Sequence, residues 1–577
     1  MFKPQLLFLF VILFNVQSIF SQHKNDNFQF ELTFEKSKGL ETATYDEMMK
    51  FYKAIANYSK NISIEKIGTT DVGLPLHLVT YSEAKPNDKT FHILINNGIH
   101  PGESDGIDAS MLMLKDIVNG KLDIPDNITL HIIPSYNLGG MLNRNSTTRA
   151  NQNGPASYGF RGNAKNYDLN RDFIKMDTKN MEAFAEIYHK INPDVYVETH
   201  VSNGADYQYT LTHLITQHNK LGFELGQFTN RTLRPLLEKS LIDKGHIITP
   251  YVNVFGRTPD EGFSQFFDYS RYSTGYTSLW NTLGLMIETH MLKPYKKRVI
   301  STKAMLESVI EITSKEQKTI ENLRASNFEK FQKSRFYKFN YVIDSTSYET
   351  LNFKGYEANK NESKVTGKPR LKYDNTKPTV KPVKYYNEFK AKDSLLIPNY
   401  YIVKSAWNTV IDKLNKNKIE MLQLKNDSII EVESIHIIDF KTSNSAYEGH
   451  YPHYDTEVNS KIEQIEFNKG DYLISTDQKG IKYLIETLEP ELKDSFFNWN
   501  FFDTVLQQKE HFSAYVFEDY ALQFLKDNPE INKAFLDKKS KDESFRNNAY
   551  AQLNWIYKKS PLYEKAHLRL PIFRVLD

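Results

Sequence analysis

The sequence predicts an α/β protein built on an open sheet, and three observations support this fold class. Residues 91–96 form a short apolar run typical of a buried strand, and residues 104–118 carry apolar side chains at helical spacing. Two further apolar runs, at 194–199 and 283–287, also read as strands. An ionisable residue follows each of the three runs. Because neighbouring parallel strands end at one edge of such a sheet, we expect these side chains to lie together.

The elements before residue 91 lead into the first of these strands. Thr44 and Glu47 have the spacing of a capping box and predict a helix over 44–56. Its buried side is expected to carry Met48, Met49, Tyr52 and Ile55. The strand-like runs 62–67 and 74–81 are joined by the turn-rich GTTDVG, so the sequence predicts a hairpin.

The stretch 91–103, FHILINNGIHPGE, places His100 and Glu103 on the turn between the predicted strand and helix. A histidine nitrogen and a carboxylate oxygen that converge suit zinc, which needs at least one more protein ligand and an open position for water. The H-x-x-E pattern alone is weak, since a glutamate also favours any helix N-terminus. The chain has no cysteine, which leaves His, Asp and Glu as its strong zinc ligands.

Further metal-capable and polar residues follow along the chain. A predicted strand at 128–134 precedes a long polar loop, 137–170, and loops of that length are uncommon unless they are functional. The loop ends in KNYDLNRDF, where Asp168, Asn170 and Arg171 cluster. After a helix at 179–190, the strand 194–199 runs directly into His200; after a helical region at 217–244 and a loop at 256–281, the strand 283–287 ends at Glu288.

The first 22 residues are typical of a secretory signal peptide. Lys3 supplies the positive charge, an apolar core covers 6–14, and small or polar residues follow, with cleavage expected between residues 18 and 22. We therefore expect a secreted or periplasmic protein. No other apolar stretch reaches about 18 residues, so no stable membrane insertion is expected after cleavage. The 73 basic and 71 acidic side chains leave a net charge of +2, and no basic excess points to nucleic acid.

A chain of 577 residues exceeds what one hydrophobic core usually organises, so we expect at least two domains. A long charged helix is predicted over 301–333, and the composition changes after it. We place the boundary near residue 335, which gives domains 23–335 and 336–577. Beyond it, 336–382 reads as loop and strand. The remainder mixes strands at 400–403, 429–438, 462–467 and 472–475 with helices near 404–416, 480–488 and 513–556.

Two features of the second domain admit alternative roles. The aromatic block 496–502 is interpreted as core or an interdomain contact rather than a ligand-stacking surface. His450 and His453 are separated by Pro452 and show no evident acidic partner, so we predict a solvated loop rather than a metal site.

Four motifs together resemble the zinc carboxypeptidase family, the carboxypeptidase A-like metallopeptidases, over residues 40–300. They are HPGE at 100–103, DLNR at 168–171, ETH at 198–200 and the strand-borne Glu288. The resemblance implies a mixed, mostly parallel eight-stranded sheet flanked by helices. The remaining residues, 336–577, lie outside the resemblance and are expected to form a mixed α and β domain of unknown role. The resemblance also implies one zinc ion per chain, held by His100, Glu103 and His200.

The resemblance further implies a role for each motif. Zinc would activate a water molecule, and Glu288 would serve as general base and acid. Asp168 would accept the proton of a ligand histidine, while Asn170 and Arg171 would grip the terminal carboxylate of the substrate.

Two further roles are less determined by the sequence. An arginine should stabilise the oxyanion, and the expanded loop offers three: Arg149 is favoured, Arg144 is second, and Arg161 is the third. A lid tyrosine should precede Glu288, and we choose Tyr272 over Tyr269 and Tyr276.

The leading functional hypothesis is a secreted zinc metallocarboxypeptidase that removes a C-terminal residue from peptides or proteins. A zinc amidase on the same scaffold, acting on peptidoglycan stem peptides or N-acyl amino acids, is a second hypothesis. A third is an envelope binding module with a relic active site. Packing alone does not require His100, Glu103, His200 and Glu288 together, which argues against the third hypothesis.

Overall fold

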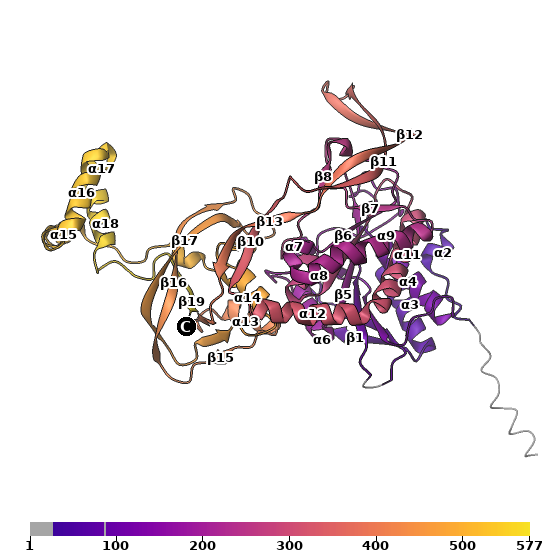
Figure 1. Ribbon diagram of the computed structural model, residues 1–577, viewed down its shortest axis with the longest axis horizontal. Coiled ribbons are helices and arrows are strands. Elements are labelled where there is room, and N and C mark those ends of the chain that lie inside the picture. Colours follow the sequence, from indigo (N-terminus) through magenta and orange to yellow (C-terminus); the bar gives the residue numbers. More distant parts are fainter. Residues whose placement is uncertain (1–26, 86–87, 577) are drawn as a thin grey trace, which may run out of the picture.

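The computed structural model of the protein describes residues 27–85 and 88–576. The predicted signal peptide, residues 1–22, lies outside the described residues. Within the described part of the chain, no helix is both long enough and apolar enough to cross a membrane. Figure 1 shows a helix-flanked sheet from the first half of the chain beside a second, smaller sheet from the later residues.

The large sheet has eight strands and confirms the predicted mixed, mostly parallel architecture. Its central strands run parallel, from β4 through β3 and β5 to β9, while β1, β2 and β6 join by antiparallel pairing. At the far edge, β7 is parallel to β6. In spatial order the strands are β1 (Ile62–Ile67), β2 (Leu76–Ser82), β4 (Ile128–Ile133), β3 (Phe91–Asn96), β5 (Val195–Ser202), β9 (Leu283–His290), β6 (Leu211–Ile215) and β7 (Ile248–Pro250).

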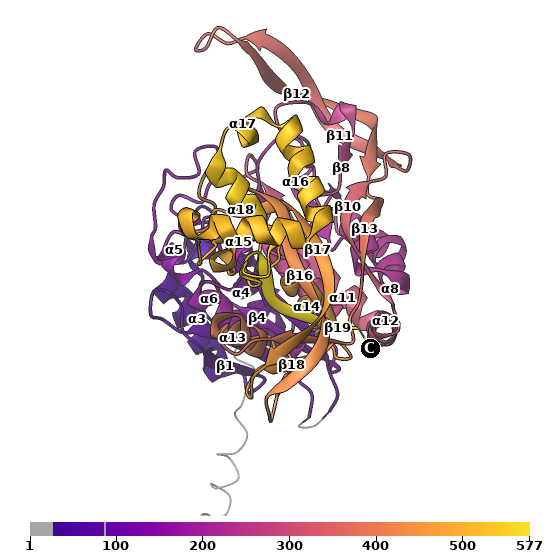
Figure 2. The same cartoon turned by 90° about the vertical axis from the view of Figure 1, so that its left-hand side faces the viewer.

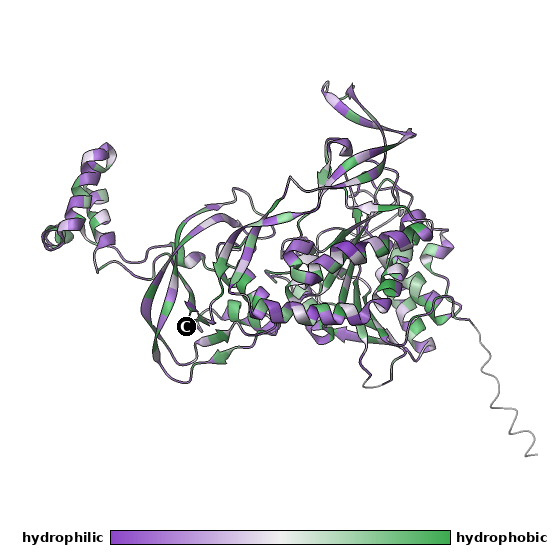
Figure 3. Cartoon of the chain, in the orientation of Figure 1, coloured by the Kyte–Doolittle hydropathy of each residue, from purple (hydrophilic) through white to green (hydrophobic). Residues whose placement is uncertain are grey.

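Helices cover both faces of this sheet because its strands are apolar on both sides. Along β3, Ile93 and Ile95 pack into the cluster that contains α3 (Tyr45–Tyr58), α4 (Asp105–Val118) and α11 (Tyr295–Lys315). Leu94, between them in the sequence, packs on the opposite side with α6 (Lys179–Ile191). Figure 3 shows hydrophobic residues concentrated along these strands.

The elements expected before β3 are present. Thr44 caps α3, its hydroxyl accepts the Glu47 N–H, and the Glu47 carboxylate accepts the Thr44 N–H. The four residues expected on the inner side of this helix are all buried. The hairpin of β1 and β2 then leads into β3.

Several predicted boundaries need correction. The strands β5 and β9 extend past His200 and Glu288, so both residues lie inside strands rather than just after them. The helical region at 217–244 divides into α7 (His218–Leu221), α8 (Phe223–Phe228), a π-helical turn and α9 (Arg234–Asp243). The charged helix is two helices, α11 and α12 (Gln317–Gln332), and the polar loop contains the short α5 (Leu138–Leu142).

Residues 336–382, predicted as loop and strand, belong to a set of paired strands that continues to residue 396. Here β10 (Phe336–Ile343) pairs with β13 (Phe389–Leu396), and between them β11 (Glu349–Glu362) and β12 (Pro369–Tyr386) form a long hairpin. This hairpin projects at the top of Figure 1. Its base pairs in parallel with β8 (Phe263–Ser264), so a strand from each side of residue 335 contributes to one sheet. The boundary at residue 335 remains a prediction.

The second sheet has six antiparallel strands. Helices α13 (Asn408–Lys416) and α14 (Ile481–Leu488) lie on the side that faces the first domain. In spatial order the strands are β15 (Leu422–Gln423), β18 (Tyr472–Ser475), β14 (Tyr400–Val403), β19 (Arg569–Val575), β16 (Ser428–Thr442) and β17 (His453–Phe467). The predicted helix at 513–556 is α15 (Ala514–Asp527), α16 (Pro529–Lys541), α17 (Glu543–Arg546) and α18 (Ala549–Lys559), which project from the body (Figures 1 and 2).

A single apolar cluster runs across both halves of the chain. It contains Leu94 and Tyr196 from the large sheet together with Tyr401, Ile411 and Phe496 from the later residues. The aromatic block is core, as predicted, and Phe497 and Trp499 are each 1% exposed. The second half of the chain therefore packs on the same side of the large sheet as α6.

The prediction for the two histidines of the second domain is wrong. His453 is buried and its Nε2 lies 3.1 Å from Asp503 Oδ1. His450 Nε2 lies 2.6 Å from Asp177 Oδ2 in the first domain. Both histidines thus have acidic partners, which are 50 and 273 residues away in sequence.

Candidate metal centre

Three side chains meet at the carboxyl edge of the large sheet with their ligand atoms facing one another. His100 Nδ1 lies 3.1 Å from His200 Nδ1, and Glu103 Oε2 lies 2.9 Å from His200 Nδ1 and 3.4 Å from His100 Nδ1. Ligand atoms around a tetrahedral zinc ion with bonds of roughly 2.0–2.1 Å stand about 3.3 Å apart. The three atoms therefore have the separations of one coordination sphere.

The outer nitrogens of the two histidines support the same interpretation. His100 Nε2 lies 2.8 Å from Asp168 Oδ1, and His200 Nε2 lies 3.3 Å from Glu198 Oε2. A carboxylate at Nε2 favours the proton there and leaves the Nδ1 lone pair directed inward. Two lone pairs and a carboxylate oxygen then converge on one point, which fits a metal ion better than any hydrogen bond among them.

The electrostatics of the cluster favour a positive charge. Against the effect of burial, Glu198 and Glu103 raise the pKa of His200 to about 10. Burial raises the pKa of Glu103, but Arg149 and His100 reverse this and hold it well below its usual range. Without a cation the site must bind a proton, so a divalent cation can replace that charge.

Close packing brings Glu103 to His200. Helix α4 lies so near β5 that a Cβ on Gly106 would stand 2.0 Å from the Thr199 hydroxyl oxygen, and only glycine fits there. Glu103, just before the helix, consequently accepts the Val201 N–H at 2.9 Å through Oε2. Its other oxygen, Oε1, accepts from Arg149 at 2.7 Å.

Glu288 stands beside the cluster without being part of it. It pairs in register with His200 on the neighbouring strand, and its side chain lines the same cavity. Among the described residues its buried Oε2 has no hydrogen-bond partner. Burial raises the pKa of Glu288 to about 8. A cation held by the adjacent ligands would lower this pKa toward the range in which a carboxylate can accept a proton near neutral pH.

The DLNR segment contacts both ligand histidines and lines the same cavity. Asp168 contacts His100 from behind, Asn170 lines the cavity with its Nδ2 3.4 Å from His200 Nε2, and Arg171 lines it with its guanidinium 4.6 Å from the Tyr272 ring centre. Tyr272 itself lines the cavity, whereas Tyr276 is fully buried and donates to Asn417.

The three loop arginines differ in position. Arg144 donates to the backbone carbonyls of Thr42, Ala43 and Ser157 and is not among the residues that line the cavity. Arg149 is 13% exposed, and its donors reach Gln152, Glu103 and the Val201 carbonyl. Arg161 is 46% exposed and is held at 2.8 Å by Asp168. Arg149 and Arg161 therefore both reach the cavity, and Arg161 is the more accessible.

The cavity has a volume of about 330 Å³ and one largely apolar wall. Sequence reasoning did not identify this wall, nor Tyr251, nor the role of Glu198. Strand alternation could have found Glu198, because it lies two residues before His200 and so on the same face. The apolar lining residues are Val201, Leu214, Phe255, Phe266, Met286 and Met291.

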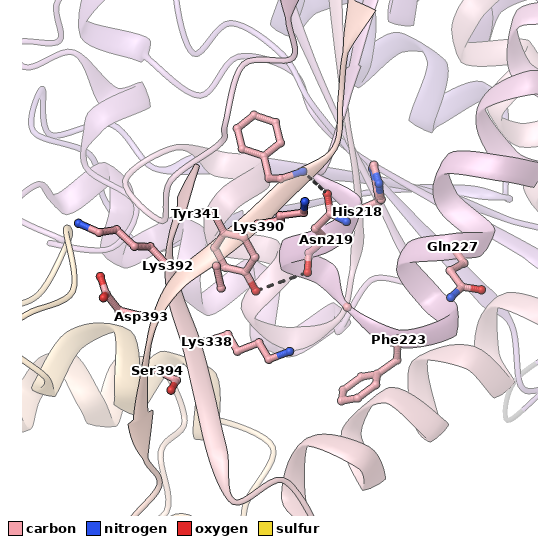
Figure 4. A pocket seen from close by; sticks show the side chains of 13 residues that line it. His218, Asn219, Phe223, Gln227, Lys338, Tyr341, Lys390, Lys392, Asp393 and Ser394 are labelled. Atoms are coloured by element: carbon pink, nitrogen blue, oxygen red, sulfur yellow. Dashed lines mark hydrogen bonds between the residues drawn. The ribbon is translucent and has the colours of Figure 1, made fainter. Parts of the chain in front are cut away.

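A larger cavity of about 620 Å³ lies between α7–α8 and the strands β10 and β13 (Figure 4). Lys338, Lys390 and Lys392 surround it, and Tyr341 donates to the Asn219 carbonyl at its wall. It contains none of the predicted catalytic residues. The chemistry is therefore assigned to the smaller cavity.

Two histidines and a carboxylate meet at one edge of an open mixed sheet, and a free carboxylate lies beside them. This arrangement is typical of a metal-dependent hydrolase. Residues 48–212 match the family model described as zinc carboxypeptidase. The resemblance predicted from the motifs is thereby confirmed for this part of the chain, and the match supports a zinc metallocarboxypeptidase.

Curated relatives and solved structures were also found. Carboxypeptidase 2 of Trichophyton rubrum is 20% identical over 491 residues, covering 80% of this chain and 84% of the relative. Carboxypeptidase 2 of Trichophyton equinum is 20% identical over 436 residues, covering 71% and 74%. A metallo-carboxypeptidase from Burkholderia cenocepacia is 16% identical, covers 47% of this chain and 70% of its own, and has a TM-score of 0.35.

Proposed function

We propose that the protein is an exported zinc carboxypeptidase that hydrolyses the last peptide bond of peptides with a free C-terminal carboxylate. The observation that carries this proposal is the placement of Arg171 in one cavity with His100, Glu103, His200 and Glu288. A metal-binding cluster alone serves many hydrolases, whereas a guanidinium in the lining of the same cavity suits a terminal carboxylate.

Each residue has a chemical role in this proposal. Zinc, when bound by His100, Glu103 and His200, would supply Lewis-acid polarisation and a water of lowered pKa. Glu288 takes the proton of the attacking water and delivers it to the leaving nitrogen, since its Oε2 has no competing partner in the described structure. Asp168 holds the His100 tautomer through Nε2.

We place Arg161 rather than Arg149 at the developing oxyanion. Arg149 holds Glu103 Oε1 at 2.7 Å and also donates to the Val201 carbonyl, whereas the half-exposed Arg161 lies farther from the same Glu103 oxygen, at 3.4 Å, and lines the cavity. Arg161→Ala is expected to lower kcat by roughly a hundredfold with little change in zinc content. Arg149→Ala should instead weaken zinc binding by releasing Glu103. The test is to measure kcat and zinc content for both variants. A large loss of kcat with normal zinc content in Arg149→Ala, but not in Arg161→Ala, would assign the oxyanion role to Arg149.

Arg171 tests the requirement for a free carboxylate. Arg171→Ala removes a charge-assisted contact and is expected to lower kcat/KM on N-acyl dipeptides about a hundredfold, with a much smaller effect on their C-terminal amides. Steady-state kinetics on matched acid and amide substrates measures the difference. Equal losses on both substrates would favour the zinc amidase hypothesis.

The cavity wall predicts the preferred C-terminal residue. Leu214 and Met286 are cross-strand partners beside Glu288, and Phe266 lies with them in the lining. Of the described residues that line the cavity, the carboxylates are Glu103 and Glu288, and both are assigned to the reaction. We expect N-acyl dipeptides ending in Phe or Leu to show at least tenfold higher kcat/KM than those ending in Lys or Arg, because an unpaired cation would be desolvated there. A preference for basic residues would contradict this wall as the side-chain site.

Export rests on the pattern of the first 22 residues. The N-terminal sequence of the protein recovered from medium or periplasm should begin near residue 23, and an intact Met1 would argue against cleavage.

A further inference from the structure

A tight turn from the second domain lies against the segment that carries the substrate clamp. Tyr447 and His450 exchange backbone hydrogen bonds of 2.8 and 3.1 Å, which closes a turn around Glu448 and Gly449. We call residues 447–450 the crossing turn. Both central residues have positive φ, +49° and +80°. Turns of this kind favour Asn-Gly, and a glutamate there is strained.

Glu448 reaches from this turn into the first domain. Its Oε2 accepts the backbone N–H of Asp168 at 2.8 Å, across 280 residues of sequence. The approach is close, because a Cβ on Gly449 would stand 2.6 Å from the Tyr167 hydroxyl oxygen. A side chain at position 449 would therefore separate the turn from the segment it contacts.

The contacted segment carries two parts of the proposed machinery. Asp168 holds His100 through its side chain, and Asn170 and Arg171 follow directly in the lining of the cavity. Burial and the Asp168 charge raise the pKa of Glu448, while the Asp168 N–H, Lys175 and Arg171 lower it. The Glu448 carboxylate thus interacts with both the backbone and the cations of this segment.

The crossing turn is itself firmly held. Tyr447 stacks on the buried Trp499 with ring centres 6.0 Å apart, and His450 pairs with Asp177 at 2.6 Å. Arg271, next to Tyr272, lies over the Trp499 ring and forms a 2.6 Å ion pair with the buried Asp494. Both Arg171 and its stacking partner Tyr272 are consequently adjacent to residues fixed by the second domain.

We propose that Glu448 is a positioning residue of the substrate site, through which the second domain holds residues 168–171 in the conformation that presents Asn170 and Arg171 to the substrate carboxylate. This inference rests on the proposed carboxypeptidase function. A strained residue at the tip of a tight turn, aimed at an active segment, is the pattern expected when local strain is retained for function. The second domain is then a structural part of the site rather than a separate module.

Glu448→Asn separates positioning from folding, because the two effects have opposite signs. Asparagine suits the positive φ, so Tm should stay equal or rise, while the shorter side chain loses the Asp168 N–H. KM for an N-acyl dipeptide acid is expected to rise about tenfold with kcat and zinc content little changed. Glu448→Gln keeps an acceptor at the same reach and should restore most of the affinity.

A matched control removes a different contact between the domains. Lys416 pairs with Glu182 at 2.9 Å, away from the DLNR segment, so Lys416→Ala should leave KM unchanged. An unchanged KM in Glu448→Asn would overturn the proposal. Equal losses of kcat/KM on the acid and on its amide, together with a lower Tm, would also overturn the proposal. That pattern would show that Glu448 makes only a structural contact. Wild-type protein that cleaves acid and amide equally well would instead show that the carboxypeptidase function itself had failed, and the proposal with it.

Discussion

Glu288→Gln is expected to lower kcat by roughly a hundred- to ten-thousandfold while the fold and the zinc content stay unchanged. Glutamine has the same shape and still accepts a hydrogen bond, but it cannot take the proton of the attacking water. Glu288 is not among the three converging ligand atoms, so its loss should not release the metal. The measurement is kcat together with zinc per chain by elemental analysis.

The same variant separates three roles for Glu288. A fourth metal ligand would lose zinc on substitution, and a bystander would lose neither zinc nor activity. Glu198→Gln is the matched control, because Glu198 is also buried beside His200 but lies behind it at Nε2. The Glu198→Gln substitution should mainly lower the metal affinity. A near-normal kcat in Glu288→Gln would refute the proposed role of Glu288 in proton transfer.

His200→Ala is expected to abolish activity by removing one of the three ligands. Loss of a carboxylate that orients a ligand typically costs ten- to a hundredfold in metal affinity, so loss of a ligand itself should cost more than roughly a hundredfold. The loss of zinc affinity is measured as the zinc content after dialysis and as the zinc concentration needed to restore turnover. Asp168→Ala should lower the zinc affinity only ten- to a hundredfold, because Asp168 contacts the outer nitrogen of His100 and is not a ligand itself.

A buried histidine elsewhere in the large sheet provides the control. His213 lies in β6 and its Nε2 is 2.8 Å from Glu238, so His213→Ala should retain one zinc per chain. Stoichiometric zinc retained in His200→Ala would refute the ligand assignment.

The sequence predicted the central strands and the metal-binding cluster because both depend on local patterns. Residues 91–96 and 283–287 are continuous apolar runs, and the parallel sheet places the residues at their carboxyl ends together. Two inner strands, β6 and β19, were missed because their apolar residues are interrupted. β6 carries buried Thr212 and His213, and β19 contains Pro571 and two arginines, so neither shows a continuous apolar run or an alternation.

Contacts between distant residues were beyond sequence reasoning. His450 and His453 were predicted to lie in a solvated loop because Pro452 separates them and no acidic partner had an evident geometry. The choice among Arg144, Arg149 and Arg161 depends on which guanidinium reaches the cavity, and a loop sequence does not determine that. The position of Glu448 beside Asp168 likewise depends on how the two domains pack.

The shared apolar cluster has a consequence for the order in which the protein matures. A ribosome completes residues 27–335 before it makes Tyr401, Ile411 and Phe496, which pack on the α6 side of the large sheet. Until those residues emerge, the apolar side chains that they cover form an exposed surface of the kind that aggregates or recruits chaperones. We expect the newly made first half to remain a folding intermediate with little activity, and maturation of the enzyme to be timed by the synthesis of its last third.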